Sequence, residues 1–414
     1  MMITEIVSQH VEEAAFLWLL RSNAVRQPHY ALKDLVKLDD RVEAHLDGLR
    51  VAGEPGWELC KAALGNEEAG EVFAASVMAF GSGIEARIQA VLDVVMAKPE
   101  LARGMVSALG WCTIEQALPQ TQWFLSSQVH LHRQIGFAGC AVHRVDPKHA
   151  LTQAVTSRNL VLRARALKAV GELGRKDLLK AVKENLGAED GQVRYWAAWS
   201  GALLGEPAAV SVLRQFVESG HPRREQACAM ALQRMSVQEG QTWLKSLAND
   251  PGTLRLAVQA AGVIGDPTNI PWLVQQMANP IIARVAGESF SFITGIDLAY
   301  DDLDTDKPEG FEAGPTENPE DENVEMDADE DLPWPNAQLI EKWWFTHRIE
   351  FTNGTRYLLG KPMAIDSLKE ALKTGRQRQR TVAALELAMR QPGTALFNTS
   401  APGFRQQALL GLKG

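Results

Sequence analysis

Apolar residues recur along most of this chain at the three- and four-residue spacing of an amphipathic helix, in successive blocks. In the stretch RARALKAVGELGRKDLLKAVKENL, residues 163–186, two such helical patterns follow one another. Gly171 and Gly174 are predicted to end the first helix, and Leu178 and Val182 begin the apolar face of the second. Each block therefore predicts a pair of helices joined by a tight turn.

The blocks repeat in register along the chain. An arginine stands near the start of each one: Arg103, Arg133, Arg163, Arg194, Arg224, Arg255 and Arg284. The intervals between these arginines are 30, 30, 31, 30, 31 and 29 residues. A small or slim residue follows three positions later in five blocks: Ala166, Ala197, Ala227, Val258 and Gly287. A glycine comes ten or eleven positions after four of the arginines: Gly174, Gly205, Gly265 and Gly295.

A single pair of short helices cannot bury its apolar stripe, whereas stacked neighbouring pairs can. The sequence therefore predicts an all-α fold, an α-solenoid of HEAT-like helix pairs. Small residues on the inner face would let adjacent helices approach closely. Polar residues that suit helix N-caps precede several of the arginines: Asn159, Asp190, Asp250 and Asn279.

The arginine ladder has two interpretations. We favour a structural one, in which each arginine binds a carboxylate or a carbonyl of a neighbouring repeat. The alternative is a basic stripe that holds phosphates. Because Lys and Arg are dispersed over the rest of the chain, the first interpretation is preferred.

The two ends of the chain depart from the repeat, and four regions are expected. Residues 1–60 form an N-terminal helical cap, in which one helix is capped by Asp39 or Asp40 and closed by Gly53. Residues 61–298 form the solenoid, residues 299–333 an insertion, and residues 334–414 a C-terminal helical cap with a divergent repeat. Terminal units of solenoids are commonly atypical because they cover an open end.

The insertion is strongly acidic. Residues 301–331 contain fifteen Asp or Glu and one Lys, a balance of −14. Because the whole chain carries −9, the remainder carries +5. With few aliphatic residues, this segment is expected to be a disordered, solvated loop. The alternative is that it lies over the basic remainder of the chain or occupies a basic groove. A calcium loop is not expected, since Lys307 and Ala313 stand where such a loop needs Gly and Glu.

Beyond the insertion, Asn336 is predicted to cap a helix that runs to His347. Three aromatic residues here are candidate partner-binding residues, Trp343, Trp344 and Tyr357, although such a cluster more often belongs to a core.

We predict no catalytic, cofactor-binding or metal-binding residues. The four cysteines lie far apart without a CxxC pair, which favours reduced, buried thiols. His130 and His132 are two residues apart and so point to different faces of a helix, although a metal with Cys140 nearby is conceivable. The first twenty residues lack the basic region of a signal peptide, and we expect a cytoplasmic protein.

The phrase shared by the repeats resembles HEAT-like repeats of the type first recognised in phycobilisome lyases. Beyond the repeats, four motifs resemble a bacterial HEAT-repeat family with little assigned biochemistry, whose genes tend to lie among type VI secretion genes: LDDRVEAHLDGLRVAGEPGW, ESFSFITGIDLAYDDLD, DEDLPWPN and APGFRQQALL. This resemblance implies a cytoplasmic accessory role, such as holding an effector before secretion.

The expected function is a non-catalytic scaffold or adaptor whose partner is another protein, with no membrane and no nucleic acid. One alternative is a nucleic-acid enzyme similar to the HEAT-like DNA glycosylases, which would need a strongly basic face. A bilin lyase is a weaker alternative. A toxin-neutralising immunity protein is a special case of the scaffold.

Overall fold

The computed structural model describes residues 4–314 and 326–412. Over these residues the chain folds into helices, with two short two-stranded ribbons. The predicted all-α solenoid is confirmed. The chain forms two compact units, of which unit 1 comprises residues 1–212 and 388–414, and unit 2 comprises residues 213–387. The described residues contain no helix that is both long enough and apolar enough to cross a lipid bilayer.

Unit 1 is built from helices that pack in chain order. Its elements are α1 (Thr4–Ala24), α2 (Leu32–Ala52), α3 (Glu54–Ala63), η1 (Leu64–Asn66), α4 (Ala69–Ser82), α5 (Glu85–Ala97), η2 (Pro99–Leu101), α6 (Ala102–Trp111), α7 (Ile114–Ser126), α8 (His130–His143), α9 (His149–Ala154), α10 (Leu160–Leu173), η3 (Lys176–Leu178), α11 (Leu179–Glu184), α12 (Gly191–Leu204) and, near the C-terminus, α22 (Gly403–Leu410). The boundaries between the units fall within α13 (Ala208–Glu218) and α21 (Gln377–Arg390).

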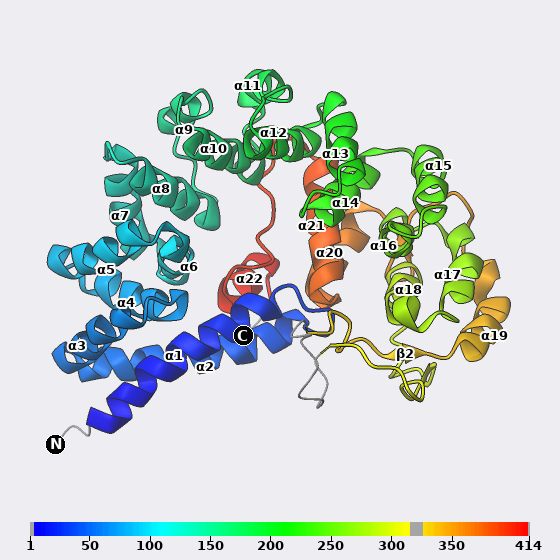
Figure 1. Ribbon diagram of the computed structural model, residues 1–414, viewed down its shortest axis with the longest axis horizontal. Helices are drawn as coiled ribbons and strands as arrows, with labels where there is room; N and C mark the ends of the chain where they lie inside the picture. Colours follow the sequence, from blue (N-terminus) through cyan, green and yellow to red (C-terminus); the bar gives the residue numbers. More distant parts are fainter. Residues whose placement is uncertain (1–3, 315–325, 413–414) are drawn as a thin grey trace. The chain divides into compact units, whose positions relative to one another are not determined.

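Within unit 1, α4, α6, α8, α10 and α12 stack side by side as the first helices of successive pairs (Figure 1). The second helix of a pair packs on the next first helix, as α7 does on α8 and α11 on α12. Gly171 shows why small residues are needed, since a Cβ there would lie 2.5 Å from Oγ of Ser200 on α12. Stacking thus buries each apolar stripe between neighbours, as the pattern predicts.

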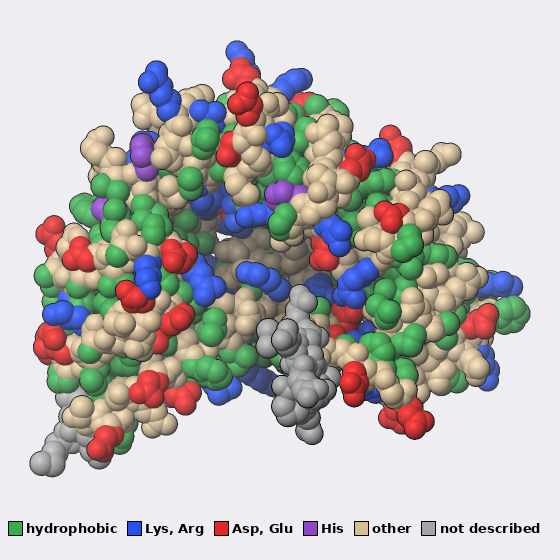
Figure 2. Space-filling model, in the orientation of Figure 1, with side chains coloured by type: hydrophobic (Ala, Val, Ile, Leu, Met, Phe, Trp, Pro, Cys, Tyr) green, Lys and Arg blue, Asp and Glu red, His purple; other side chains and the backbone are tan. Residues whose placement is uncertain are grey.

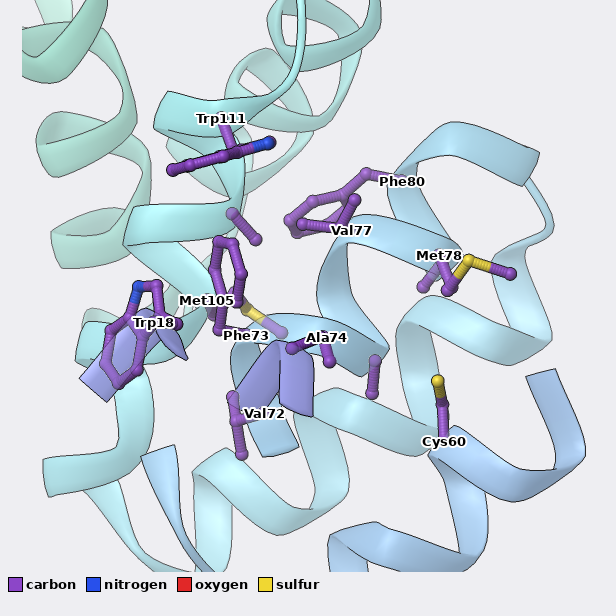
Figure 3. Packing of buried hydrophobic residues seen from close by; sticks show 14 of the residues in the cluster. Trp18, Cys60, Val72, Phe73, Ala74, Val77, Met78, Phe80, Met105 and Trp111 are labelled. Carbon is purple, nitrogen blue, oxygen red and sulfur yellow. The ribbon is translucent and has the colours of Figure 1, made fainter. Parts of the chain in front are cut away.

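The N-terminal part of unit 1 has an aromatic core (Figure 3). Trp18 of α1 stacks on Phe73 of α4 with ring centroids 5.5 Å apart, and Phe73 meets Trp111 of α6 edge to face at 5.5 Å. The indole Nε1 of Trp18 donates to Oγ of Ser107 at 2.7 Å, so the buried polar atom is satisfied. Residues 1–60 therefore share one core with the first repeats.

Unit 2 continues the same construction. Its elements are α14 (Arg224–Arg234), α15 (Val237–Ala248), α16 (Leu254–Ile264), η4 (Pro267–Asn269), α17 (Ile270–Gln276), α18 (Pro280–Thr294), β1 (Asp304–Thr305), β2 (Trp334–Pro335), α19 (Ala337–His347), η5 (Arg348–Glu350), β3 (Tyr357–Leu358), β4 (Lys361–Pro362) and α20 (Ile365–Thr374). First helices α14, α16 and α18 pack in order, and α15 and α17 pack on α16 and α18. Strands β1 and β2 pair antiparallel and join the two ends of the acidic insertion, while β3 and β4 form a second ribbon.

Local capping follows the sequence prediction at most positions. The side chains of Asn159, Asp190 and Asn279 accept from the amides of Leu162, Val193 and Ile281, respectively, and Asn336 accepts from Leu339. The predicted glycines Gly174, Gly205, Gly265 and Gly295 all have positive φ and cap first helices in the left-handed conformation.

Two capping predictions are wrong. Asp250 accepts from the amide of Gly252 within a turn, and α16 begins after Thr253 instead. Helix α2 begins at Leu32, where Asp34 accepts from the amide of Ala31, so Asp39 is not a cap. Asp39 instead lies inside α2, where its carboxylate binds a buried arginine, Arg21 of α1, at 2.5 Å.

Part of the acidic insertion also differs from a solvated loop. Residues 315–325 lie outside the described residues. Of the described residues that follow, Asp329 is 3% exposed, because it binds an arginine of the ladder, and Leu332 is buried as well. For Asp329, the alternative prediction that the segment lies over basic residues agrees with the structure better than the prediction of a solvated loop does.

Candidate protein-binding surfaces

The arginine ladder runs through the first helices from α6 to α18, with Arg103 near the start of α6 and Arg284 in α18. In unit 1, Nε of Arg163 donates to the carbonyl of Ser157 at 2.6 Å, and Nη1 of Arg194 donates to that of Ala188 at 2.6 Å. Both carbonyls belong to the turn that leads into the same helix. Arg103 lies over the ring of Trp18, 5.7 Å from its centroid. Two of these arginines therefore bind the turn before their own helix, and the pairing of each arginine with a neighbouring repeat stays a prediction.

For two further members of the ladder, no such side-chain contact is seen among residues 4–314 and 326–412. Arg133 is the fourth residue of α8, and Arg224 is the first residue of α14. Both are half-buried.

In unit 2 the last two ladder arginines bind the acidic insertion. Arg255 and Asp329 form a bidentate pair, with Nη1–Oδ2 at 2.7 Å and Nη2–Oδ1 at 2.6 Å. Nη2 of Arg284 lies 2.7 Å from Oδ2 of Asp327. Hydrogen bonds from guanidinium to carboxylate are among the strongest in proteins. The same ladder that ties turns in unit 1 thus binds acidic side chains in unit 2.

The C-terminal strap, residues 391–402, has no helix or paired strand; it contains a turn at each end, passes the C-terminal ends of α8 and α10 and leads into α22 (Figure 1). The amide of Leu396 donates to the carbonyl of Glu172 at 3.0 Å, and Nε of Arg144 donates to the carbonyl of Leu396 at 2.6 Å. Nδ2 of Asn398 donates to the carbonyl of Val142 at 3.4 Å. Most of these contacts use backbone atoms, so the helices hold this segment largely independently of its side chains.

The strap ends at a buried ion pair. Arg21 and Asp39 are 6% and 2% exposed. Nη1 and Nη2 of Arg21 donate to the carbonyls of Ser400 and Ala401 at 3.1 and 2.8 Å, and the amide of Gly403 donates to Oδ2 of Asp39 at 2.5 Å. We call Arg21 and Asp39 the strap anchor. The sequence analysis did not identify it, because nothing in the pattern relates the first two helices to residues near the C-terminus.

An open groove lies on α8, α10 and α12 of unit 1. It encloses about 310 Å³, and the exposed side chains of Leu160 and Val161 line one end. At the other end, Nζ of Lys168 lies 4.6 Å from the ring centroid of Trp196. An apolar floor with a cation and an aromatic ring is typical of a protein-binding groove.

The groove is connected to the strap through Glu172. Nη1 of Arg165, which lines the groove, donates to Oε2 of Glu172 at 2.9 Å, and the carbonyl of Glu172 holds Leu396 of the strap. Burial acts to raise the pKa of the Glu172 carboxyl, but Arg165, Lys168 and Arg144 outweigh burial and lower it. The carboxylate is therefore charged at neutral pH and fixes the cations around it.

The predicted partner-binding aromatics are not gathered on one open surface. Tyr357 is buried, and its hydroxyl accepts from the amide of Thr352 at 2.9 Å. Trp343 is half-buried, with its ring stacked on His347 at 4.3 Å, and Trp344 is half-buried against Phe351. These three side chains contribute to packing around α19, so any role of theirs in binding remains a prediction.

The described residues offer no cluster of three or more potential metal ligands. Nδ1 of His132 lies 3.0 Å from Oγ of Ser127, and Nε2 of His143 lies 2.7 Å from the carbonyl of Leu109. All four cysteines are free and buried, and burial raises the pKa of each thiol to about 12. Such thiols are poor nucleophiles at neutral pH.

Charge is mixed on the surface of unit 1. On the face drawn in Figure 2, the outer helices of this unit carry acidic, basic and apolar side chains next to one another. A nucleic-acid groove requires basic residues gathered on one face.

Comparison with known proteins supports HEAT repeats in part of the chain. Residues 148–233 match the family model for HEAT repeats. No curated protein matches the sequence. The matched stretch begins next to α9 and ends in α14, so it contains α10 and α12, which supply most of the groove lining, but not Gln134 of α8. The family relationship that the sequence supports is HEAT repeats over residues 148–233. The all-α solenoid continues the same stacking of helix pairs on both sides of this stretch.

Proposed function

We propose that this protein is a non-catalytic scaffold that binds an extended segment of another protein. The observation that carries the proposal is the C-terminal strap. Unit 1 holds this non-helical segment through carbonyls near the ends of α8 and α10 and through the side chains of Arg21 and Arg144. A surface that binds one such segment in this way is suited to bind a second.

The open groove on α8, α10 and α12 is the proposed place for that second segment. Val161 is 62% exposed and supplies apolar area, while Lys168 and Trp196 can recognise carboxylates, carbonyls or aromatic rings. The groove also lies within the residues that match HEAT repeats, and stacked helical repeats commonly present extended binding surfaces.

The finer form of the proposal is an accessory protein of a type VI secretion system in the cytoplasm, one that holds an effector before secretion. The resemblance of the flanking motifs to a bacterial HEAT-repeat family supports it. An immunity protein would use the same groove on a toxin.

The test begins with full-length protein immobilised and exposed to lysate of the source organism, followed by reconstitution with the purified partner. We expect Val161→Asp and Lys168→Glu each to weaken the reconstituted complex at least about tenfold. Val51→Asp is the matched control, because Val51 is 89% exposed on α2, away from the groove. A complex that all three variants form equally well would contradict the proposed groove. Failure to retain any protein partner would contradict the scaffold itself.

A secretion-system or effector protein as the partner would support the finer form. A partner of another kind would remove it and leave the scaffold in place.

A further inference from the structure

The acidic insertion places two aspartates, Asp327 and Asp329, on two arginines of the ladder in unit 2. Asp329 is 3% exposed and its partner Arg255 is partly open, with a side chain 36% exposed. Arg284 is 5% exposed and its partner Asp327 is half-buried. The two arginines belong to successive first helices, whereas the two aspartates are separated by a single residue.

Aromatic rings complete the site around Arg284. Its guanidinium carbon lies 4.5 Å from the ring centroid of Trp334 and 5.8 Å from that of Phe311. The Nε of Arg284 is buried and has no hydrogen-bond partner among the described residues. A cavity of about 470 Å³ adjoins the guanidinium. Arg284 is thus held rigidly by its rings while part of its donor capacity stays unused.

The backbone of the acidic segment is arranged to present both carboxylates. The amide of Asp329 donates to Oδ1 of Asp327 at 3.0 Å, and the amide of Glu330 donates to the carbonyl of Asp327 at 3.2 Å. Few apolar contacts hold this segment, since Met326 is 68% exposed and Ala328 and Glu330 are exposed. The two ion pairs therefore contribute most to holding residues 326–331 against unit 2, up to the buried Leu332.

An acidic side chain near Arg255 also opposes the binding of Asp329. Glu288 of α18 is half-buried and pairs with Arg378 at 2.8 Å. The pKa of this carboxyl is raised, mainly by burial and further by Asp329, against the opposing effects of Arg378 and Arg255. Any carboxylate bound at Arg255 therefore lies near Glu288, so a competing segment meets the same repulsion as Asp329 does.

We propose that Arg255 and Arg284 form a binding site for an acidic segment of a partner protein that carries two carboxylates separated by one residue. In the free protein the chain's own Asp327 and Asp329 occupy this site as an internal mimic of that segment. The inference rests on the proposed protein-binding function, and it adds a second binding surface and the chemistry of the partner. Because the mimic is tethered, its effective concentration is high, and a partner needs further contacts to displace it.

The test uses a synthetic peptide with the sequence of residues 326–332, MDADEDL, labelled with fluorescein and followed by fluorescence anisotropy. The proteins are the full-length chain and its Asp327→Asn/Asp329→Asn variant, in which the internal mimic is weakened. We expect the variant to bind the peptide at least about tenfold more tightly than the wild-type chain. Binding should weaken as salt rises, because the contacts are ionic.

Three controls make the result specific. Arg255→Ala, added to the double variant, should abolish binding, as should the peptide MNANEDL. Glu330→Gln should behave as wild type, because Glu330 is exposed and the described ion pairs of Arg255 and Arg284 use Asp329 and Asp327 instead. Lys245→Glu reverses an exposed charge of unit 2 outside the ladder and should leave binding within about twofold.

Equal binding by the wild type and the double variant would overturn the proposal, as would binding that survives Arg255→Ala or the Asn peptide. If the double variant loses its helical circular dichroism, and so does not fold, the proposal is tested instead by hydrogen exchange of residues 326–332 in the wild-type chain. Excess MDADEDL peptide should then accelerate exchange, and MNANEDL should not; no acceleration by MDADEDL would reject displacement. This peptide assay requires no partner, so its outcome is independent of the test of the scaffold.

Discussion

Replacement of Asp39 by Asn should release the C-terminal strap and strongly destabilise unit 1. The substitution keeps the shape of the side chain but removes its charge. The guanidinium of Arg21, 6% exposed, would then remain buried without a negative charge beside it, and one of the two carboxylate oxygens that accept from it would be replaced by an NH2 donor. Breaking a buried ion pair by neutralising one partner costs about 3–5 kcal/mol. For a unit of this size, each kcal/mol corresponds to about 2–4 °C, so we expect a fall in Tm of about 6–20 °C.

The measurement has two parts, which together separate loss of the strap from general loss of stability. Calorimetry gives the change in Tm, and native-state hydrogen exchange reports on α22, whose amides should lose protection before those of α10 do. Asp47→Asn is the matched control, because Asp47 pairs with Arg50 at 2.5 Å but its side chain is 64% exposed. That exposed pair should contribute less than about 1 kcal/mol.

Two results would refute this reasoning. One is a shift for Asp39→Asn no larger than that for Asp47→Asn, which would mean that water or another group compensates Arg21. The other is a large fall in Tm with normal protection of α22, which would mean that the ion pair joins α1 to α2 without holding the strap.

Three other predictions test the physical basis of the fold. Gly265→Ala should lower Tm by several degrees more than Gly83→Ala. Both glycines have positive φ. Of the two, only Gly265 has a backbone atom in the way of a Cβ, the carbonyl oxygen of Tyr357 at 2.3 Å. Asp190→Ala should cost about 1 kcal/mol in denaturant unfolding because it removes an N-cap, and Asp250→Ala should cost less than half of that. The four buried thiols, with pKa values raised to about 12, should resist Ellman's reagent at pH 8 until the protein unfolds. The free energy of unfolding should also fall above about pH 9, because the thiols of the unfolded chain ionise there and those of the folded chain do not. Rapid labelling of the native protein would contradict both statements.

The repeat could be predicted because its signals are local. Helical spacing, an N-cap such as Asn159 and a glycine such as Gly174 act within a few residues of one another, and the structure places both as the sequence predicts. The role of Arg163 and Arg194 in tying turns is equally local, since their acceptors lie six residues earlier. For these features, the chemistry of the side chain determines its place.

The strap and its anchor could not be predicted for the opposite reason. The strap is held through backbone atoms, which every sequence offers, and the donors Arg21 and Arg144 lie more than 200 residues away from it. Asp39 was misassigned as a cap because a polar residue before an apolar run gives the same local pattern whether it caps a helix or pairs inside one. A buried carboxylate is recognisable only when its partner is known.

The ends of the first helices explain how one repeated phrase can both build a stack and bind a polypeptide. The last carbonyls of a helix lack partners within the helix, and they need donors. In unit 1 the carbonyl of Glu172, one residue before the last of α10, accepts from Leu396; in unit 2 the carbonyls of Gly265 and Phe292 accept from Tyr357 and Leu359. Where a glycine ends the helix, it allows a passing chain to come this near: a Cβ at Gly174 would lie 2.4 Å from the carbonyl oxygen of Thr394. A row of such helix ends is thus a row of backbone acceptors at regular spacing, and an extended segment, from this chain or from a partner, is the form of polypeptide that can satisfy them.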